Sequence, residues 1–340
     1  MQTIIQAIQA YLPRRPKQGV NRQRRFLMLM GAATLVAACT RSRQSEVISN
    51  ASTSGASTSG AVKRVQHALG ETEVPTHPSR VVVWGYTLVE AVVALGIQPI
   101  GMPGIMVNEM MHLALDATAI TDIDASGQPN LEAIAVLKPD LILTTQPVVG
   151  DNYPRLSQIA PTVVFDIDER LEWRELTRLC GDVLGKQAEA QKLSTDYEAK
   201  LQQFIAQLPP DAAQIQASVV FISPGQIRTL AKASFPGTVL EEAGLSRPPG
   251  QAEGPGLRNI SLESLDEIDG DVMFLLTPQS VTELAAGVRA EIDRVQASPL
   301  WPQLKAVQTN QIYEVGPHWA LGNYIAANLI LDDLLAYMGN

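Results

Sequence analysis

The sequence predicts an α/β protein made of two lobes with parallel sheets, joined by a single long helix. Three observations predict it: an amphipathic helix near the middle of the chain, a resemblance between its two flanks, and alternating strands and helices. The helix is expected over residues 186–208, where apolar residues recur every three or four positions. Gly185 precedes this run, and Pro209 cannot continue a helix. At about 1.5 Å per residue, it is roughly 35 Å long, enough to join two lobes.

The two flanks of this helix resemble each other. Residues 130–143 (NLEAIAVLKPDLIL) match residues 261–274 (SLESLDEIDGDVMF) at a constant offset of 131. Residues 153–160 (YPRLSQIA) match residues 301–308 (WPQLKAVQ) at an offset of 148. Two matches in the same order indicate that one half-chain has been used twice. The alternative is that any helix followed by a strand looks similar in an α/β protein.

Each lobe is expected to open with a strand and to continue with alternating helices and strands. In the first lobe, strands are expected over residues 80–84, 97–101, 141–145 and 162–167, and helices over 88–95, 130–138, 153–160 and 169–184. In the second lobe, strands are expected over 217–223, 272–277 and 312–315, helices over 237–243, from 261 and over 325–338, and a loop over 245–257. Asp140 and Asp271 lie at equivalent helix-to-strand turns, where we expect them to accept backbone hydrogen bonds rather than to form an acid/base pair.

The composition is that of a folded chain long enough for two domains. It has 340 residues, of which 46% are apolar and 18% are charged. The formal charge is −9, but residues 1–38 hold six basic residues and no acidic one, and without them 20 basic residues face 35 acidic ones, a charge of −15. Such an acidic body has no general attraction for nucleic acid, so an anionic ligand has to be held by a few placed cations.

The N-terminal segment has the pattern of an export signal. A basic run that ends at Arg25 is followed by about a dozen apolar residues, too few for a stable membrane span, and then by the small residues before Cys39. The sequence before Cys39 resembles a bacterial lipobox, which implies cleavage there and lipid attachment to the Cys39 sulfur. The alternative is a short buried helix. A twin-arginine signal is matched imperfectly at Arg24-Arg25, so the export route stays open.

Motifs for nucleotide cofactors and hydrolase triads are absent from the sequence. There is no GxGxxG, GxxxxGK[ST] or GxSxG pattern. His112 and His318 are weak candidates for metal ligands, because a metal site needs three or four ligands from separated segments. Cys180 lies in an amphipathic run and is expected to be a small buried hydrophobic residue.

A ligand is expected beyond the carboxyl ends of the strands, in the cleft between the lobes, as in other open parallel sheets. The candidate residues lie in the loops placed there and are aromatic or cationic: Trp84, Tyr86, Arg228, Arg258, Trp319 and Tyr324. Aromatic faces supply rigid contact area, and an arginine fork suits carboxylate or hydroxamate oxygens. The set therefore suits a bulky, partly anionic small molecule. The alternative for Trp84 and Trp319 is that they only plug the ends of the lobes.

Several motifs together resemble a known family. HPSRVVVWGYTLVEAVVALGIQPIG, NLEAIAVLKPDLIL, SFPGTVLEEAGL, ISLESLDEIDGDVMFLL and SPLWPQLKAVQTNQIYEV are similar to the periplasmic substrate-binding proteins of iron-siderophore and vitamin B12 ABC importers, from Thr76 to the C-terminus. The resemblance implies the class III fold, two Rossmann-like lobes joined by one helix. It also implies that Glu132 and Glu263, one on each lobe, pair with arginines of the permease. The alternative for each is an exposed acid favoured by the helix dipole.

The resulting prediction is a lipid-anchored solute-binding protein without catalytic activity. Its parts are expected to be a signal peptide (1–38), a tether (39–61), an N-terminal lobe (62–168), a helical connector (169–208) and a C-terminal lobe (209–340). It is expected to be a monomer that needs no cofactor, lies on the periplasmic side of the inner membrane, and delivers a ferric hydroxamate, catecholate or citrate to an ABC permease and its ATPase. The alternatives are cobalamin or haem on the same fold, a metal-cluster enzyme, or a surface scaffold.

Overall fold

The computed structural model describes residues 61–104, 115–124, 128–166, 173–277, 282–320 and 322–338. The signal segment, Cys39 and the tether predicted before residue 61 lie outside these residues, as does His112. None of the described helices has both the length and the hydropathy needed to cross a bilayer.

The N-terminal lobe contains a five-stranded parallel sheet in the order β5-β4-β3-β6-β7. Its strands are β3 (Val81–Trp84), β4 (Gly101–Met102), β5 (Thr121–Asp122), β6 (Leu141–Thr145) and β7 (Thr162–Phe165). Its helices are α2 (Tyr86–Ala94), η1 (Ala117–Ala119), α4 (Leu131–Leu137), α5 (Gln146–Val149), η2 (Gly150–Asn152) and α6 (Tyr153–Ile159). The central strands are buried along their whole length, as expected for a parallel sheet covered on both faces.

An N-terminal hairpin, which the sequence analysis did not predict, adds to this lobe. It consists of β1 (Val62–His67) and β2 (Gly70–Pro75), paired antiparallel. The backbone N–H of Ala68 donates to the carbonyl of Val164 (2.9 Å), and the hydroxyl of Thr72 donates to the carbonyl of Thr162 (3.3 Å). The hairpin therefore lies against β7, which would otherwise present an open strand edge.

The C-terminal lobe contains a second five-stranded sheet, in the order β10-β9-β8-β11-β12. Its strands are β8 (Ala217–Ser223), β9 (Gln226–Leu230), β10 (Leu257–Ile260), β11 (Val272–Leu276) and β12 (Ile312–Val315). Its helices are η3 (Ala212–Gln214), α9 (Phe235–Glu242), α10 (Pro249–Ala252), η4 (Leu262–Ile268), α11 (Thr282–Gln296), η5 (Trp301–Gln303), α12 (Lys305–Gln308), η6 (Pro317–Trp319) and α13 (Tyr324–Met338). The strands β8, β11 and β12 are parallel, whereas β9 and β10 are antiparallel, so this sheet is mixed.

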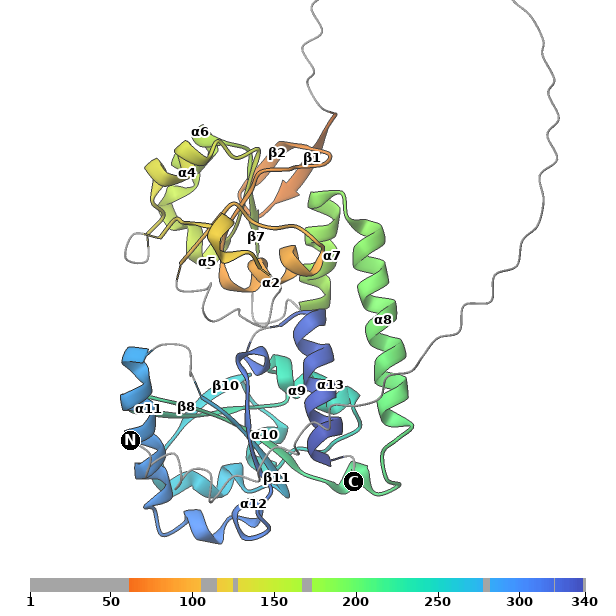
Figure 1. The fold of residues 1–340 in the computed structure, drawn as a ribbon, viewed down its shortest axis with the longest axis vertical. Coiled ribbons are helices and arrows are strands. Elements are labelled where there is room, and N and C mark those ends of the chain that lie inside the picture. Colours follow the sequence, from red (N-terminus) through yellow and green to blue (C-terminus); the bar gives the residue numbers. More distant parts are fainter. Residues whose placement is uncertain are drawn as a thin grey trace, which may run out of the picture. The chain divides into compact units, whose positions relative to one another are not determined.

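Two helices, which follow the N-terminal sheet and precede the C-terminal sheet in the chain, contribute side chains to both hydrophobic cores. They are α7 (Trp173–Leu184) and α8 (Gln187–Ile205), which pack against each other and are drawn in green in Figure 1. In α8, Ala190 belongs to the N-terminal core, and Phe204 belongs to the C-terminal core. In α7, Trp173 joins the C-terminal core, and Leu184 joins the N-terminal one. The predicted central helix is confirmed, and α7 shares its bridging role.

The turn between these helices requires glycine. Gly185 has a positive φ of 69°, a conformation that side chains rarely adopt. A Cβ atom there would also lie 2.3 Å from the carbonyl oxygen of Thr76. The turn therefore packs directly on the chain that enters β3.

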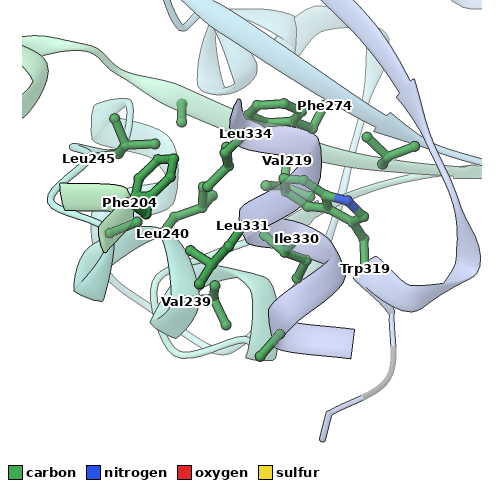
Figure 2. Packing of buried hydrophobic residues seen from close by; sticks show 14 of the residues in the cluster. Phe204, Val219, Val239, Leu240, Leu245, Phe274, Trp319, Ile330, Leu331 and Leu334 are labelled. Atoms are coloured by element: carbon green, nitrogen blue, oxygen red, sulfur yellow. The ribbon is translucent and has the colours of Figure 1, made fainter. Parts of the chain in front are cut away.

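The largest core cluster lies between the C-terminal sheet and helices α8, α9 and α13. Figure 2 shows its central side chains. They come from the sheet (Val219, Phe274), from α8 and α9 (Phe204, Val239, Leu240), from the following loop (Leu245), and from η6 and α13 (Trp319, Ile330, Leu331, Leu334). Because all of these side chains are at most 5% exposed, removing one of the larger ones leaves a cavity.

The internal repeat is visible at the two aspartates between helix and strand. Asp140 accepts hydrogen bonds from the backbone N–H groups of Ser79 (2.8 Å) and Arg80 (2.9 Å), just before β3. Asp271 accepts one from the backbone N–H of Gln216 (2.8 Å), just before β8. Each carboxylate thus accepts hydrogen bonds from the backbone just before the first strand of the five-stranded sheet in its lobe, as predicted.

The repeat is imperfect at the helices before these aspartates. In α4, the side chain of Asn130 accepts a hydrogen bond from the backbone N–H of Ala133 (3.1 Å), which confirms it as the N-cap. The equivalent segment η4 is a 3-10 helix with non-helical backbone angles at Ser264, and Ser261 makes no capping bond to the backbone. The helix expected from residue 261 is therefore only a short, irregular 3-10 segment, and Ser261 is not the counterpart of the Asn130 cap. The predicted loop 245–257 also contains α10.

A buried hydrogen bond joins residues of the two lobes. The amide of Asn323 donates to the carboxyl of Glu90 in α2, and both side chains are fully buried. The Asn323 oxygen accepts from the backbone N–H groups of Ile325 (2.6 Å) and Ala326 (3.0 Å). Asn323 thus caps α13 and holds α2 at the same time.

Replacing Asn323 with alanine is expected to lower the free energy of unfolding by about 2–4 kcal/mol. The change removes a helix cap, worth about 1 kcal/mol, and one donor to a buried carboxyl, worth about 1–3 kcal/mol. Urea unfolding followed by circular dichroism measures the loss. Asn130→Ala is the matched control, because it removes only the cap of α4. An Asn323→Ala loss no larger than that of the control would contradict the contribution of Glu90.

Candidate ligand-binding site

A cavity of about 670 Å³ opens on one face of the C-terminal sheet. The sheet supplies Phe221, Arg228, Leu230, Leu257 and Leu276 to its wall. The rest of the wall consists of residues 233–236 at the start of α9, the loop Gly254–Gly256, and Ala320. This volume is in the range of small-molecule sites, and its walls are mostly apolar with a single charged side chain.

The pairing of β9 with β10 determines which side chains face the cavity. Arg228 lies directly opposite Asn259, and Thr229 lies opposite Arg258. Directly opposed residues share a face of the sheet, and neighbours along a strand lie on opposite faces. Arg228 therefore faces the cavity, and Arg258 lies on the other face.

Arg228 brings a positive charge to the cavity. Its Nε donates to the Asn259 side-chain oxygen (3.2 Å), its Nη2 donates to the Gln226 side-chain oxygen, and its guanidinium lies 5.7 Å from the centre of the Phe221 ring. These acceptors are neutral amides. Among the described residues, no carboxylate pairs with Arg228, so its charge is available to a ligand.

Arg258 does not share this site. Its Nη2 pairs with the carboxylate of Glu267 in η4 and donates to the carbonyl oxygen of Gly250 (3.0 Å). Arg228 and Arg258 were both expected in loops that line one site. They lie instead on adjacent antiparallel strands, and their side chains are on opposite faces of the sheet. This arrangement does not fit the prediction that both line the same site.

The two predicted tryptophans are parts of the cores. Trp319 is fully buried, stacks on Phe274 with ring centres 4.5 Å apart, and donates from Nε1 to Asp333 (2.9 Å). Trp84 is 4% exposed and packs in the N-terminal core. Neither side chain has surface left for a ligand in this structure, which favours the alternative that they fill the lobes.

Tyr324 is also buried, in an aromatic cluster at the start of α13. Its ring lies edge-on to Trp173 (4.8 Å) and to Tyr197 (6.0 Å). Trp173 in turn contacts Phe235 of the cavity wall, with ring centres 5.6 Å apart. Tyr324 therefore supports the cavity through two other rings. The side chain of Tyr86 lies outside the described set, so its predicted contact stays a prediction.

The two predicted docking glutamates are both exposed, each in the first turn of its helix. Glu132 lies on α4, and Glu263 lies on η4. A hydrogen bond from the Ser261 side chain lowers the pKa of Glu263 most, and a backbone hydrogen bond and the more distant charge of Arg294 lower it further. Glu263 is thus an ionised carboxylate at neutral pH.

The remaining ionisable groups offer no resident metal centre within the described residues. No group of three His, Cys, Asp or Glu side chains gathers there. His318 pairs with Asp333 (2.8 Å). Cys180 is fully buried, and its burial raises the pKa of the thiol, which confirms it as a buried hydrophobic residue.

The apolar walls of the cavity could not be recognised from the sequence. Phe221 and Leu276 look like ordinary strand residues, and Leu257 was expected in a loop; these three become cavity residues through the register of the mixed sheet. Phe235 joins them from the start of α9. The Gly254–Gly256 loop gave the one usable signal, since Gly and Pro together indicate an irregular segment.

Residues 81–318 match the family model described as periplasmic binding protein. The chain belongs to this family. It is a family of binding proteins rather than of enzymes. The match covers both sheets and the connecting helices, and it confirms the predicted family and the predicted two-lobed α/β fold.

Several relatives of this chain are named as siderophore-binding or ferric-citrate-binding proteins. A probable siderophore-binding lipoprotein of Bacillus subtilis, YfiY, is 30% identical over 324 residues, covering 92% of this chain and 96% of the relative. The achromobactin-binding periplasmic protein of Dickeya dadantii is 30% identical and covers 77% and 87%. The structure of Staphylococcus aureus SirA complexed with staphyloferrin B is 28% identical, with a TM-score of 0.70 over 80% of this chain and 97% of SirA.

Proposed function

We propose that the protein is the substrate-binding component of an ABC importer and captures a ferric siderophore or ferric citrate. The observation that carries the proposal is the cavity of about 670 Å³, with apolar walls and the positive charge of Arg228, in a periplasmic binding protein whose relatives include siderophore- and ferric-citrate-binding proteins. A bulky chelate buries its organic surface against Phe221 and Phe235, and Arg228 contacts its oxygen atoms. Cobalamin or haem in the same cavity is the alternative.

Delivery requires a permease, and we assign its contact points to Glu132 and Glu263. The exposure of both carboxylates and their equivalent positions in the repeat support this assignment. A binding protein with two related lobes can thereby present one charge to each half of a twofold permease. Lipid on Cys39 would hold the protein at the outer surface of the inner membrane, within reach of the permease and its ATPase.

The test is equilibrium titration of the purified protein by fluorescence quenching. The panel contains a ferric tris-hydroxamate, a ferric tris-catecholate, ferric citrate, cobalamin and hemin. Saturable binding of one ferric chelate is the expected result, and mass spectrometry of ligand retained through native purification identifies it. Binding of cobalamin or hemin alone, or of nothing on the panel, would overturn the proposal.

Arg228→Met is expected to weaken binding of that chelate by at least about ten-fold. The substitution removes charge-assisted hydrogen bonds, which are worth about 1.5–3 kcal/mol each, and keeps most of the side-chain volume. Arg155→Met removes an exposed arginine from α6 of the other lobe and is the control, with no expected change. Equal affinity of Arg228→Met and the native protein would remove Arg228 from the site.

A further inference from the structure

A second arginine lies behind the wall of the cavity; it is buried, and none of the carboxylates in the described part of the chain pairs with it. Arg247 is only 8% exposed. Its Nη2 donates to the carbonyl oxygen of Leu230 and to the side-chain oxygen of Gln251. Its Nε and Nη1 are buried without any hydrogen-bond partner among the described residues. Burial lowers the pKa of Arg247 to about 9, and the group is still protonated at neutral pH.

The hydrogen bonds of Arg247 place it against the cavity wall. Leu230, whose carbonyl it contacts, is a lining residue. The next residues are held from both directions: Ala231 donates from its backbone N–H to the carbonyl of Gly256 in the cavity wall (3.0 Å), and Lys232 donates from its backbone N–H to the carbonyl of Gln251 (2.8 Å). The side chain of Leu230 thus lines the cavity, while its carbonyl oxygen accepts a hydrogen bond from Arg247.

Other cations around the C-terminal core pair with carboxylates, whereas Arg228 and Arg247 have no carboxylate partner among the described residues. Arg258 pairs with Glu267, Arg174 pairs with Glu242, and Lys232 pairs with Glu241 (2.6 Å). An unpaired buried charge is costly to the fold. In a low-dielectric surrounding, its field is also weakly screened and reaches across a layer of side chains.

We propose that Arg247 sets the charge preference of the cavity, so that the protein selects ferric chelates with a net negative charge over neutral ones. The inference rests on the proposed function and narrows its substrate class. Three hydroxamates neutralise Fe(III), whereas catecholates or excess carboxylates leave a negative complex. Arg228 contacts the ligand directly. Arg247 does not touch the ligand, but the electric field of its charge reaches the cavity from behind the wall and determines specificity.

The experiment compares the affinities of the native protein, Arg247→Met and Gln251→Glu for a ferric tris-catecholate, ferric citrate and a neutral ferric tris-hydroxamate. Gln251→Glu keeps Arg247 and replaces the amide that accepts its hydrogen bond with a carboxylate. The variant therefore neutralises the charge of Arg247 with almost no change in side-chain shape. Two unit charges about 12 Å apart at an effective dielectric of about 20 interact by about 1.4 kcal/mol, or about ten-fold in affinity. Thermal unfolding verifies that each variant is folded.

The native protein is expected to bind a negative chelate at least about ten-fold more tightly than the neutral one. Each variant is expected to reduce this ratio about ten-fold and to leave the affinity for the neutral chelate unchanged. Lys232→Gln, which removes a paired and half-exposed cation from the same lobe, is expected to leave the ratio within about two-fold of native.

Three results would overturn the inference. They are a native preference for the neutral chelate, variants that weaken all chelates equally, and variants that retain the native ratio. If Arg247→Met does not fold, the near-isosteric Gln251→Glu decides the question. Failure of the native protein to bind any chelate would instead refute the proposed function itself.

Discussion

Cells whose only copy of the protein carries both Glu132→Ala and Glu263→Ala are expected to lose import of the iron chelate, while the purified variant binds the chelate with native affinity. The two carboxylates are exposed and lie outside the cavity wall, so their removal leaves the ligand site intact. A charge pair buried at a docked interface is worth about 2–5 kcal/mol when one partner is truncated. Loss of two such pairs is expected to reduce import to background, measured as uptake of radioactive iron.

The single variants are expected to differ. The hydrogen bond from Arg294 to Glu291 raises the pKa of Arg294, and the nearby charge of Glu263 raises it further. Part of the Glu263 charge is thus engaged within the lobe, and Glu132→Ala is expected to impair import more than Glu263→Ala. The control is the pair Glu189→Ala and Glu198→Ala on α8, which removes the same charge elsewhere. Native import by the Glu132/Glu263 double variant would refute the docking assignment.

Trp319→Ala is expected to lower the free energy of unfolding by about 3–5 kcal/mol. Truncation of a buried tryptophan removes its apolar contacts and leaves a cavity. At Trp319 it also removes the stacking on Phe274 and leaves the Asp333 carboxylate without its indole donor (2.9 Å). Urea unfolding at neutral pH measures the loss.

The conservative variant Trp319→Phe separates a core role from a ligand role. It keeps an aromatic ring against Phe274, so a loss of only about 1–2 kcal/mol is expected, with native ligand affinity. If the variant is folded and stable but binds the chelate more than ten-fold more weakly, Trp319 contacts the ligand after all, and the prediction from its loop position stands.

The parts of the fold that the sequence could predict are those that depend on local chemistry. The α8 helix follows from apolar spacing and from Gly185 at its start, and the start of α4 follows from the capping side chain of Asn130. Asp140 and Asp271 could be assigned to backbone hydrogen bonds because the repeat gave them the same place in each lobe. These features involve neighbours in sequence or a relation visible by comparing the two halves.

The candidate site was harder to predict because it depends on the register of strands and on burial. A turn at Pro224-Gly225 and the Gly-rich residues 245–257 made the segments that hold Arg228 and Arg258 look like loops, although these residues lie on the antiparallel strands β9 and β10. Only their pairing shows that Arg228 faces the cavity while Arg258 faces Glu267. Loop position placed Trp319 at the ligand, but Phe274 and Asp333, far from it in sequence, fix it in the core.

The burial of Cys180 has a practical consequence for measuring iron capture. A fully buried thiol with a raised pKa reacts poorly with maleimides. A version of the protein that begins after Cys39 therefore has no other thiol that competes for the label. A cysteine introduced at Leu257, which lines the cavity and is 51% exposed, could then carry an environment-sensitive dye at a single position. Such a labelled protein would report chelate capture optically.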